Sequence, residues 1–235
     1  MRLRANSRDY QKSPTEFLEI LEKIDRSKAR LENSLPTIKW NLSKIYLREL
    51  ESRGVKIVPT IWPEKTPTEN DLAAWLDFFK TDEIIIKPIV SATAEDTYRL
   101  TEFQNDLAEI FDNRPFMIQP FMPKIVSEGE FSLFYFGGNY SHTILKTPKP
   151  KDFRVQEEHG GIITAVRPSA KLLEKTKKVL DLVEPTPLYV RIDFVRDERD
   201  DFCLMELELI EPALYLRMDE NAPSLFAQTI DEWLR

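Results

Sequence analysis

The residues best suited to chemistry lie in two apolar, strand-like segments near the C-terminus. Asp193 lies within residues 188–195, Glu206 and Glu208 lie within residues 202–210, and a short charged turn can pair the segments as a hairpin. Alternate residues of a strand share a face, so Glu206 and Glu208 point the same way, and a suitable register adds Asp193. Three carboxylates in an apolar setting repel one another and need cations, and such oxygen ligands suit Mg²⁺. The alternative is an exposed hairpin face with ordinary surface acids.

Basic and polar residues elsewhere are of types that suit a phosphate-bearing ligand. Lys87 ends an isoleucine run, and the loop at 89–94 could cover phosphate oxygens with backbone amides while the lysine supplies a point charge. The segment 119–122, followed by Glu130, could offer a backbone edge to a base and a carboxylate to a ribose. Each feature alone also fits a simpler interpretation, an exposed strand-end lysine or a loop between two strands.

Composition narrows the class of protein. The 235 residues carry a net charge of −7, and without a basic surplus we expect no nucleic-acid partner. Cys203 is the single cysteine and lies in an apolar strand, so we expect it to be structural in a cytoplasmic protein. No run reaches the 18 or so apolar residues that would span a membrane, so we expect no membrane partner.

The positions of apolar and turn-forming residues predict a mixed α and β chain with a mostly antiparallel second half. Helices are expected at 13–31, from Asn41 to Gly54, and at 68–79, 95–111, 169–182 and 223–234. Strands are expected at 55–58, 83–87, 116–119, 130–136, 140–145, 162–166, 188–195 and 202–210. Residues 146–159 are expected to form a polar loop.

In this order the elements resemble the ATP-grasp superfamily of ligases. The matching pattern is Lys44 in a helix, Lys87-Pro88 on a strand, a hinge from Gln119 to Glu130, Arg191-x-Asp193, and Glu206-x-Glu208. Segments at 39–44, 126–136, 153–161 and 206–218 resemble, more narrowly, ATP-grasp proteins like the ligase that closes the ring of D-cycloserine. The resemblance implies an α+β, ATP-grasp fold, in which two α+β subdomains with mostly antiparallel sheets hold ATP between them.

The resemblance also implies a division of the chain. Residues 1–40 would be the remnant of an N-terminal domain, residues 41–122 the first ATP-grasp subdomain with the hinge, and residues 123–235 the second subdomain with the metal site. Met1–Asp9 resembles the end of the separate domain that usually precedes the ATP-grasp fold. We therefore expect the chain to start partway through that domain.

Roles for individual residues follow from the resemblance. The expected nucleotide contacts are Lys44 and Lys87 at the phosphates, Gln119, Phe121 and Met122 at the adenine, and Glu130 at the ribose. Asp193, Glu206 and Glu208 would bind two Mg²⁺ ions, with Mn²⁺ as an alternative metal. Arg154 and Arg191 would be catalytic, contacting the transferred phosphoryl group and the reacting oxyanion, and His159 and Arg217 are the candidates for substrate contacts.

The activity implied is that of an ATP- and Mg²⁺-dependent ligase forming C–N bonds between a carboxylic acid and an amine, or another nucleophile, through an acyl phosphate. Both substrates would be small and amino-acid-like, and a homodimer stays open. Two alternatives remain, a non-catalytic ATP-grasp module that binds nucleotide and a phosphotransferase that stops after phosphoryl transfer. The sequence departs from the family pattern at residues 91–97, which lack glycine, and at Glu208, where many relatives have asparagine.

Overall fold

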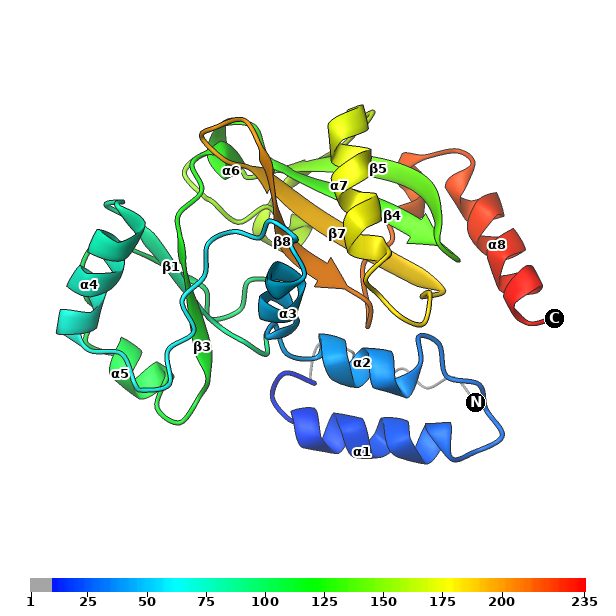
Figure 1. The fold of residues 1–235 in the computed structure, drawn as a ribbon, viewed down its shortest axis with the longest axis horizontal. Helices are drawn as coiled ribbons and strands as arrows, with labels where there is room; N and C mark the ends of the chain where they lie inside the picture. The colour runs from blue at the N-terminus through cyan, green and yellow to red at the C-terminus, as the bar shows by residue number, and fades with distance from the viewer. Residues whose placement is uncertain (1–9) are drawn as a thin grey trace.

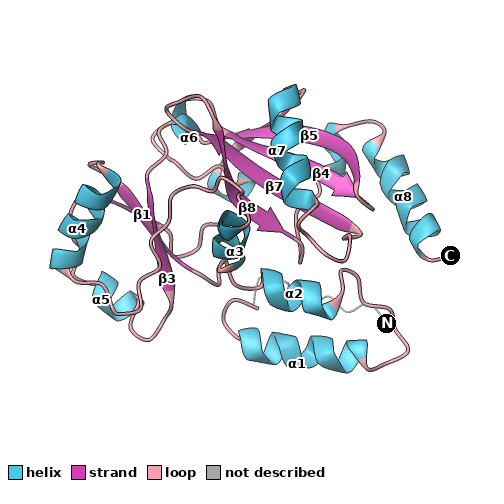
Figure 2. Ribbon diagram, viewed as in Figure 1, coloured by secondary structure: helices cyan, strands magenta, loops and turns pink. Residues whose placement is uncertain are grey.

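Two antiparallel sheets organise residues 10–235, the part of the chain that the computed structural model describes (Figures 1 and 2). The smaller sheet, in the order β2-β1-β3, contains β1 Ile84–Pro88, β2 Tyr98–Leu100 and β3 Phe116–Pro120. The larger, in the order β6-β5-β4-β7-β8, contains β4 Glu130–Phe136, β5 Asn139–Thr147, β6 Ile162–Ala165, β7 Tyr189–Arg196 and β8 Phe202–Glu208. Helices combined with antiparallel sheets confirm the α+β class.

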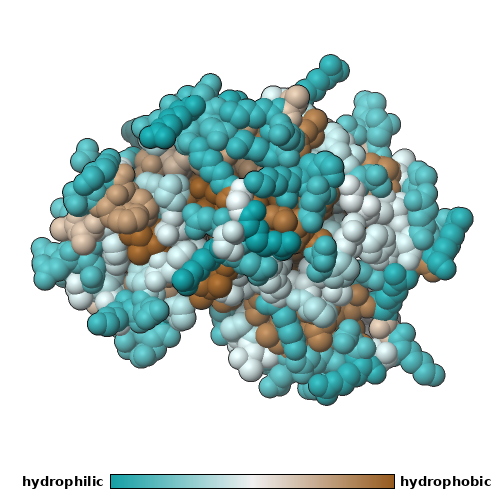
Figure 3. All heavy atoms as spheres, in the orientation of Figure 1, coloured by the Kyte–Doolittle hydropathy of each residue, from teal (hydrophilic) through white to brown (hydrophobic). Residues whose placement is uncertain are grey.

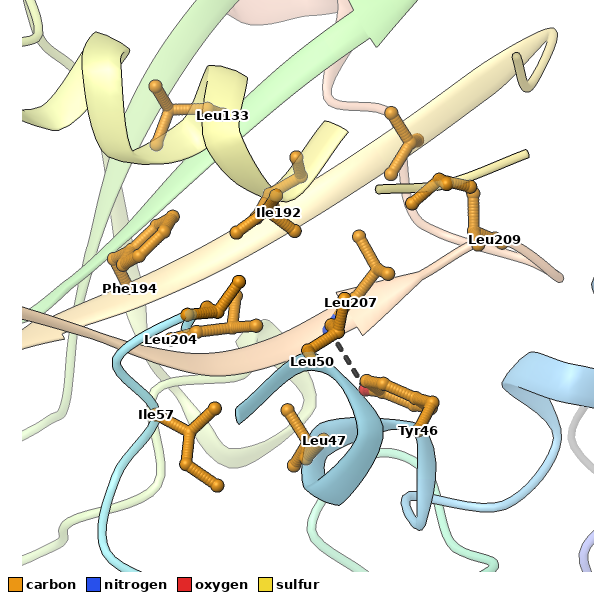
Figure 4. Close-up of a cluster of buried hydrophobic side chains, with 14 of the residues drawn as sticks. Tyr46, Leu47, Leu50, Ile57, Leu133, Ile192, Phe194, Leu204, Leu207 and Leu209 are labelled. Carbon is orange, nitrogen blue, oxygen red and sulfur yellow. Dashed lines mark hydrogen bonds between the residues drawn. The ribbon is translucent and has the colours of Figure 1, made fainter. Parts of the chain in front are cut away.

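The main hydrophobic core lies on one face of the larger sheet. Leu133 of β4 and Ile192 of β7 are fully buried there, together with residues of α3 Tyr46–Ser52 and α7 Ala170–Leu180 (Figure 4). The Tyr46 hydroxyl accepts a hydrogen bond of 2.9 Å from the backbone N–H of Leu207, which ties α3 to β8. Burial of each large apolar side chain contributes about 1.5–3 kcal/mol. Since this face takes the apolar residues, strand alternation sends their neighbours to the opposite face.

The smaller sheet has a core of its own. It packs with α4 Glu69–Phe79 and α5 Leu107–Ile110, which lie beside β1 and β3 at one end of the molecule (Figure 1). Trp75 of α4 meets the ring of Phe116 at 6.2 Å between centroids in an edge-to-face arrangement. The smaller sheet thus has its own hydrophobic cluster, and its strand ends and loops face the larger sheet.

The remaining helices cover the other edges of the larger sheet. Helices α1 Pro14–Asp25 and α2 Leu35–Asn41 share a small apolar cluster, while α8 Ala222–Trp233 packs Phe226 on Phe136 with 4.6 Å between ring centroids. Helix α6 Lys124–Ser127 is a single turn. Across residues 10–235 there is no helix both long and apolar enough to cross a membrane. Polar side chains cover most of the face in Figure 3, with apolar patches between them.

Three predicted elements differ from the structure. The helix expected at 95–111 is instead β2, paired antiparallel with β1, and the single turn α5, because Leu100, Leu107 and Phe111 fill the core beneath α4. The helix expected between Asn41 and Gly54 is present as α3, but it begins only at Tyr46, and Lys44 lies in the turn before it. Asn41 ends α2, and its side-chain amide bonds to the backbone of β8, donating to Leu207 O at 2.8 Å and accepting from Leu209 N at 2.9 Å.

The third wrong element is the strand at 55–58, which makes a single parallel bridge to β8, at Ile57. The first helix also ends at Asp25 rather than near residue 31. The expectation for Met1–Asp9 lies outside the described residues.

Candidate active site

The hairpin of β7 and β8 places its charged residues on one face. Arg191 pairs with Glu208 and Asp193 with Glu206, and the pairing then shifts between Asp193 and Phe194. Carboxylate oxygens of Asp193, Glu206 and Glu208 all lie within 4.8 Å of one another. Three carboxylates at this spacing form a donor set that fits a hard divalent cation. The register that the sequence left open therefore brings all three acids together.

Neighbouring strands add a buried lysine to this face. Lys146 of β5 pairs with Glu130 of β4, and its Nζ lies 2.5 Å from Glu130 Oε1 and 3.2 Å from Asp193 Oδ2. Lys146 is 3% exposed, so little water screens these pairs. The sequence analysis missed this residue because the expected strand stops at residue 145, two residues before the end of β5. Extending the alternation from His142 through Ile144 would have placed Lys146 on the face of the acids.

The electrostatic environment sets the acids apart. Burial opposes ionisation of Asp193, but the charges of Arg191 and Lys146 outweigh it and lower the pKa of Asp193. The pKa of Glu208 is raised to about 7, first by burial and then by the charges of Glu206 and Asp193, although Arg191 donates a hydrogen bond to it. Near neutral pH this face therefore holds one firmly ionised carboxylate, Asp193, and one, Glu208, that exchanges a proton easily.

Two lysines approach the acids from the first half of the chain. Lys44 Nζ lies 2.9 Å from Glu206 Oε1 and donates to the carbonyl of Ser91 at 2.7 Å. Lys87 is the next-to-last residue of β1, and burial, together with the charge of Lys44, lowers its pKa to about 8. Burial opposes ionisation of Glu206 as well, but the charges of Lys44 and Lys87 lower its pKa. The two lysines and the acids thus meet where the two sheets approach each other.

A cavity opens between the two sheets at this point. The predicted nucleotide residues Lys44, Lys87, Gln119, Phe121, Met122 and Glu130 all line it, with Arg154 and Glu206. Met205 also lines it and was missed, since its position in the shifted register of β8 is invisible to simple alternation. Gln119 donates to Thr60 Oγ1 at 3.0 Å, so its side chain is held by the protein.

Arg154 lies in the loop between β5 and β6, at residues 148–161. Its guanidinium makes a two-pronged contact with Asp152, 3.1 Å from Nε to Oδ1 and 3.0 Å from Nη2 to Oδ2. The hydrogen bonds from Arg154 hold the pKa of Asp152 well below its usual range. A guanidinium fixed in this way keeps its Nη1 edge as a donor for an anion in the cavity.

The two candidate substrate residues lie at short helical turns instead of on the cavity wall. His159 lies in the turn η2 Glu157–His159 and donates from Nε2 to the carbonyl of Thr93 at 3.0 Å. Arg217 lies in the turn η3 Leu216–Met218, where its Nη2 is 2.6 Å from Glu157 Oε1. Both side chains contact protein groups at the edge of the site.

Solved structures share this architecture. The crystal structure of the D-cycloserine synthetase DcsG aligns with 97% of this chain and 82% of that one, with a TM-score of 0.79 and 26% identity. The ATP-grasp ligase PsnB, complexed with a precursor variant, Mg and ADP, covers 94% of this chain and 68% of its own, with a TM-score of 0.65 and 16% identity. The D-alanine–D-alanine ligase of Bacillus anthracis, complexed with ATP, has a TM-score of 0.63 and 12% identity over 90% of this chain and 71% of its own. The expected ATP-grasp fold is confirmed.

Sequence comparison decides the family. No protein-family model matches the chain. The cycloserine biosynthesis protein DcsG of Streptomyces lavendulae is 30% identical over 244 residues, covering 94% of this chain and 78% of DcsG. The chain belongs to the ATP-grasp ligases. In this ATP-grasp ligase, the cavity with its lysines and carboxylates lies between the two sheets, on the face of the larger sheet opposite the main core.

Proposed function

We propose that this ATP-grasp ligase is a cytoplasmic enzyme that uses ATP and Mg²⁺ to join a small carboxylic acid to an amine or similar nucleophile. The observation that carries the proposal is the ion pair of Lys44 with Glu206 in the wall of the cavity. On one side the lysines can neutralise phosphates, and on the other the carboxylates can hold the metal. Positioning and charge neutralisation are the two tasks that phosphoryl transfer requires of a protein.

Each residue is assigned a task by its place around the cavity. Lys44 and Lys87 would hold the phosphates, the segment from Gln119 to Met122 the adenine, and Glu130 the ribose. Asp193, Glu206 and Glu208 would hold two Mg²⁺ ions, for which Mn²⁺ could substitute, and the bound metal would neutralise charge on the phosphates. Lys146 joins this set, because its ammonium lies between Glu130 and Asp193. The proposed subdomains, 41–122 and 123–235, each contain one of the two sheets.

The two arginines would act on the reacting groups. In the proposed reaction the substrate carboxylate takes the γ-phosphoryl group, and a nitrogen nucleophile then displaces phosphate from the resulting acyl phosphate. Arg154 offers an oriented donor edge to the transferred group, since Asp152 fixes its guanidinium. Arg191 lies beside Asp193 and Glu208, where it can steady the oxyanion that forms. A donor of this kind is worth about 10²–10³ in rate.

The substrates would be amino-acid-like. Two structural relatives support this class, a D-cycloserine synthetase and a D-alanine–D-alanine ligase. A panel of D- and L-amino acids, tested singly and with hydroxylamine as a general nucleophile, should show one or more acids that stimulate release of ADP and form a hydroxamate.

The experiment measures ADP release and hydroxamate with the wild type, Asp193→Ala and Glu206→Ala. Both variants should lose Mg-ATP turnover by at least about 10²-fold while unfolding cooperatively, and Asp231→Ala, an exposed carboxylate on α8, should be unaffected. Turnover that survives in both variants would overturn the metal assignment. Stable phosphorylated acid that hydroxylamine leaves intact would instead favour a phosphotransferase. Binding of Mg·ADP without stimulation by any acid would favour a non-catalytic module.

A further inference from the structure

The loop at 148–161 is attached across the cavity to the first half of the chain. Near its middle, the ring of Phe153 meets the ring of Phe121 edge to face, with 6.2 Å between centroids. Near its end, His159 Nε2 donates to Thr93 O at 3.0 Å. Arg154 lies between these two contacts and lines the cavity. The loop is therefore a strap held at two points, Phe153 and His159, with the arginine between them.

The acceptor end of the His159 contact is held in an uncommon backbone conformation. Thr93 has φ of 53°, in the left-handed region that a β-branched residue rarely adopts, and Ala94 follows at 55°. Such conformations persist only where surrounding contacts hold them, and they cluster at ligand clamps and switches. The carbonyl of Thr93 is thus presented to His159 by a specifically shaped turn.

The donor end belongs to a turn that closes back onto the strap. The backbone N–H of Gly161 donates to Gln156 O at 3.0 Å, and a Cβ at position 161 would lie 2.0 Å from the carbonyl oxygen of Val155. Only glycine allows the chain to approach itself so closely. The turn is packed against Val155 and Gln156, the residues that follow Arg154. A displacement of His159 would therefore also displace these neighbours of Arg154.

His159 itself lies outside the cavity wall. Thr93, Phe153, Arg154, Val155 and Gln156 line the cavity, whereas His159 is outside this lining and bonds to the backbone carbonyl of Thr93. We propose that His159 is a positioning residue that holds the strap at 148–161 over the nucleotide cavity and thereby aims Arg154, instead of contacting the substrate. The expected effect on nucleotide binding rests on the proposed function. The contact of His159 with Thr93, which anchors the loop, can be tested without nucleotide.

The test compares wild type, His159→Ala and His159→Gln. Glutamine keeps an N–H donor at a similar reach, so it should rescue what alanine loses. Lys151→Gln, a change at an exposed residue of the same loop, is the matched control. Hydrogen exchange of residues 152–161 is measured first without nucleotide and then with Mg·ADP, and calorimetry gives the affinity for Mg·ADP.

His159→Ala should raise exchange in 152–161 about three- to tenfold even without nucleotide, the loss expected of one hydrogen bond. Its affinity for Mg·ADP should fall by a similar factor, with His159→Gln and Lys151→Gln near the wild type. Unchanged exchange in His159→Ala would overturn the anchor. If His159→Ala leaves exchange and Mg·ADP affinity unchanged but raises the KM for the acid, His159 contacts the substrate instead. If the wild type does not bind Mg·ADP, the proposed nucleotide site is wrong. Hydrogen exchange without nucleotide would still show whether His159 holds the loop.

Discussion

Lys146 and Asp193 form a buried ion pair at the centre of the larger sheet, with 3.2 Å between Nζ and Oδ2. Asp193 is 1% exposed, and the same lysine also neutralises Glu130. Since β5 and β7 both pair with β4, this contact passes over β4 and links three strands. It also compensates the charge of carboxylates whose ionised form burial would otherwise destabilise. The pair therefore supports the fold as well as the site.

Lys146→Met should destabilise the protein by about 3–5 kcal/mol, because it leaves buried carboxylates without their partner. Urea denaturation near neutral pH measures the loss. Lys171→Met, which removes an exposed lysine paired with Asp201, should cost about 1 kcal/mol or less. Adding Glu130→Gln to Lys146→Met should restore part of the loss. A Lys146→Met protein as stable as the control would contradict the role of the pair.

Glu208 should make stability depend on pH. Its pKa of about 7 lies above the ordinary 4.5, so between these values the folded state holds a proton that the unfolded state lacks. The stabilising contribution is complete below about pH 4.5 and is lost as the pH rises through about 7. Glutamine resembles protonated glutamate, so in Glu208→Gln the free energy of unfolding should lack this part of its dependence on pH. Urea denaturation from about pH 5 to about pH 8 compares the two, and Glu102→Gln, an exposed change, should follow the wild type.

Lys87 should couple nucleotide binding to proton uptake. Burial and the charge of Lys44 lower its pKa to about 8, so the ammonium form that attracts phosphate is lost as the pH rises through that value. Affinity for Mg·ADP should fall over this range, and binding there should take up protons, which calorimetry in buffers of different ionisation enthalpy detects. Arginine keeps its charge over this range, so Lys87→Arg should make the affinity for Mg·ADP nearly independent of pH. Equal proton uptake by both proteins would exclude Lys87 as the source.

Gly161→Ala should disrupt the loop at 148–161 without unfolding the sheets. The added Cβ would lie 2.0 Å from the carbonyl oxygen of Val155, which is main chain and cannot rotate away. Gly160→Asn is the matched control, since asparagine tolerates the φ of 86° found there and only the side chain of Lys149 must move. Hydrogen exchange in the loop should rise at least about tenfold for Gly161→Ala and little for Gly160→Asn. Similar exchange in the two variants would mean that the close approach is not required.

Local patterns were sufficient for the parts of the site that lie within one hairpin. Alternation along the strands predicted that Glu206 and Glu208 share a face, and the short turn predicted the hairpin, while the register that adds Asp193 came from the structure. Local patterns failed where distant segments decide the outcome. Residues 95–111 became β2 and a single turn because β1 offers a free edge and the cluster beneath α4 takes Leu100 and Phe111.

The sequence by itself determined the fold class, the carboxylate hairpin and the lysines that face it, because strand alternation and the order of motifs are properties of the chain. Only the tertiary structure decided that Lys146 neutralises Asp193, that Asn41 bonds to β8 and that His159 faces Thr93. These contacts join residues 47, 166 and 66 positions apart. Their formation depends on how sheets and loops pack, and hydrogen bonds and ion pairs of this kind act only over a few ångströms.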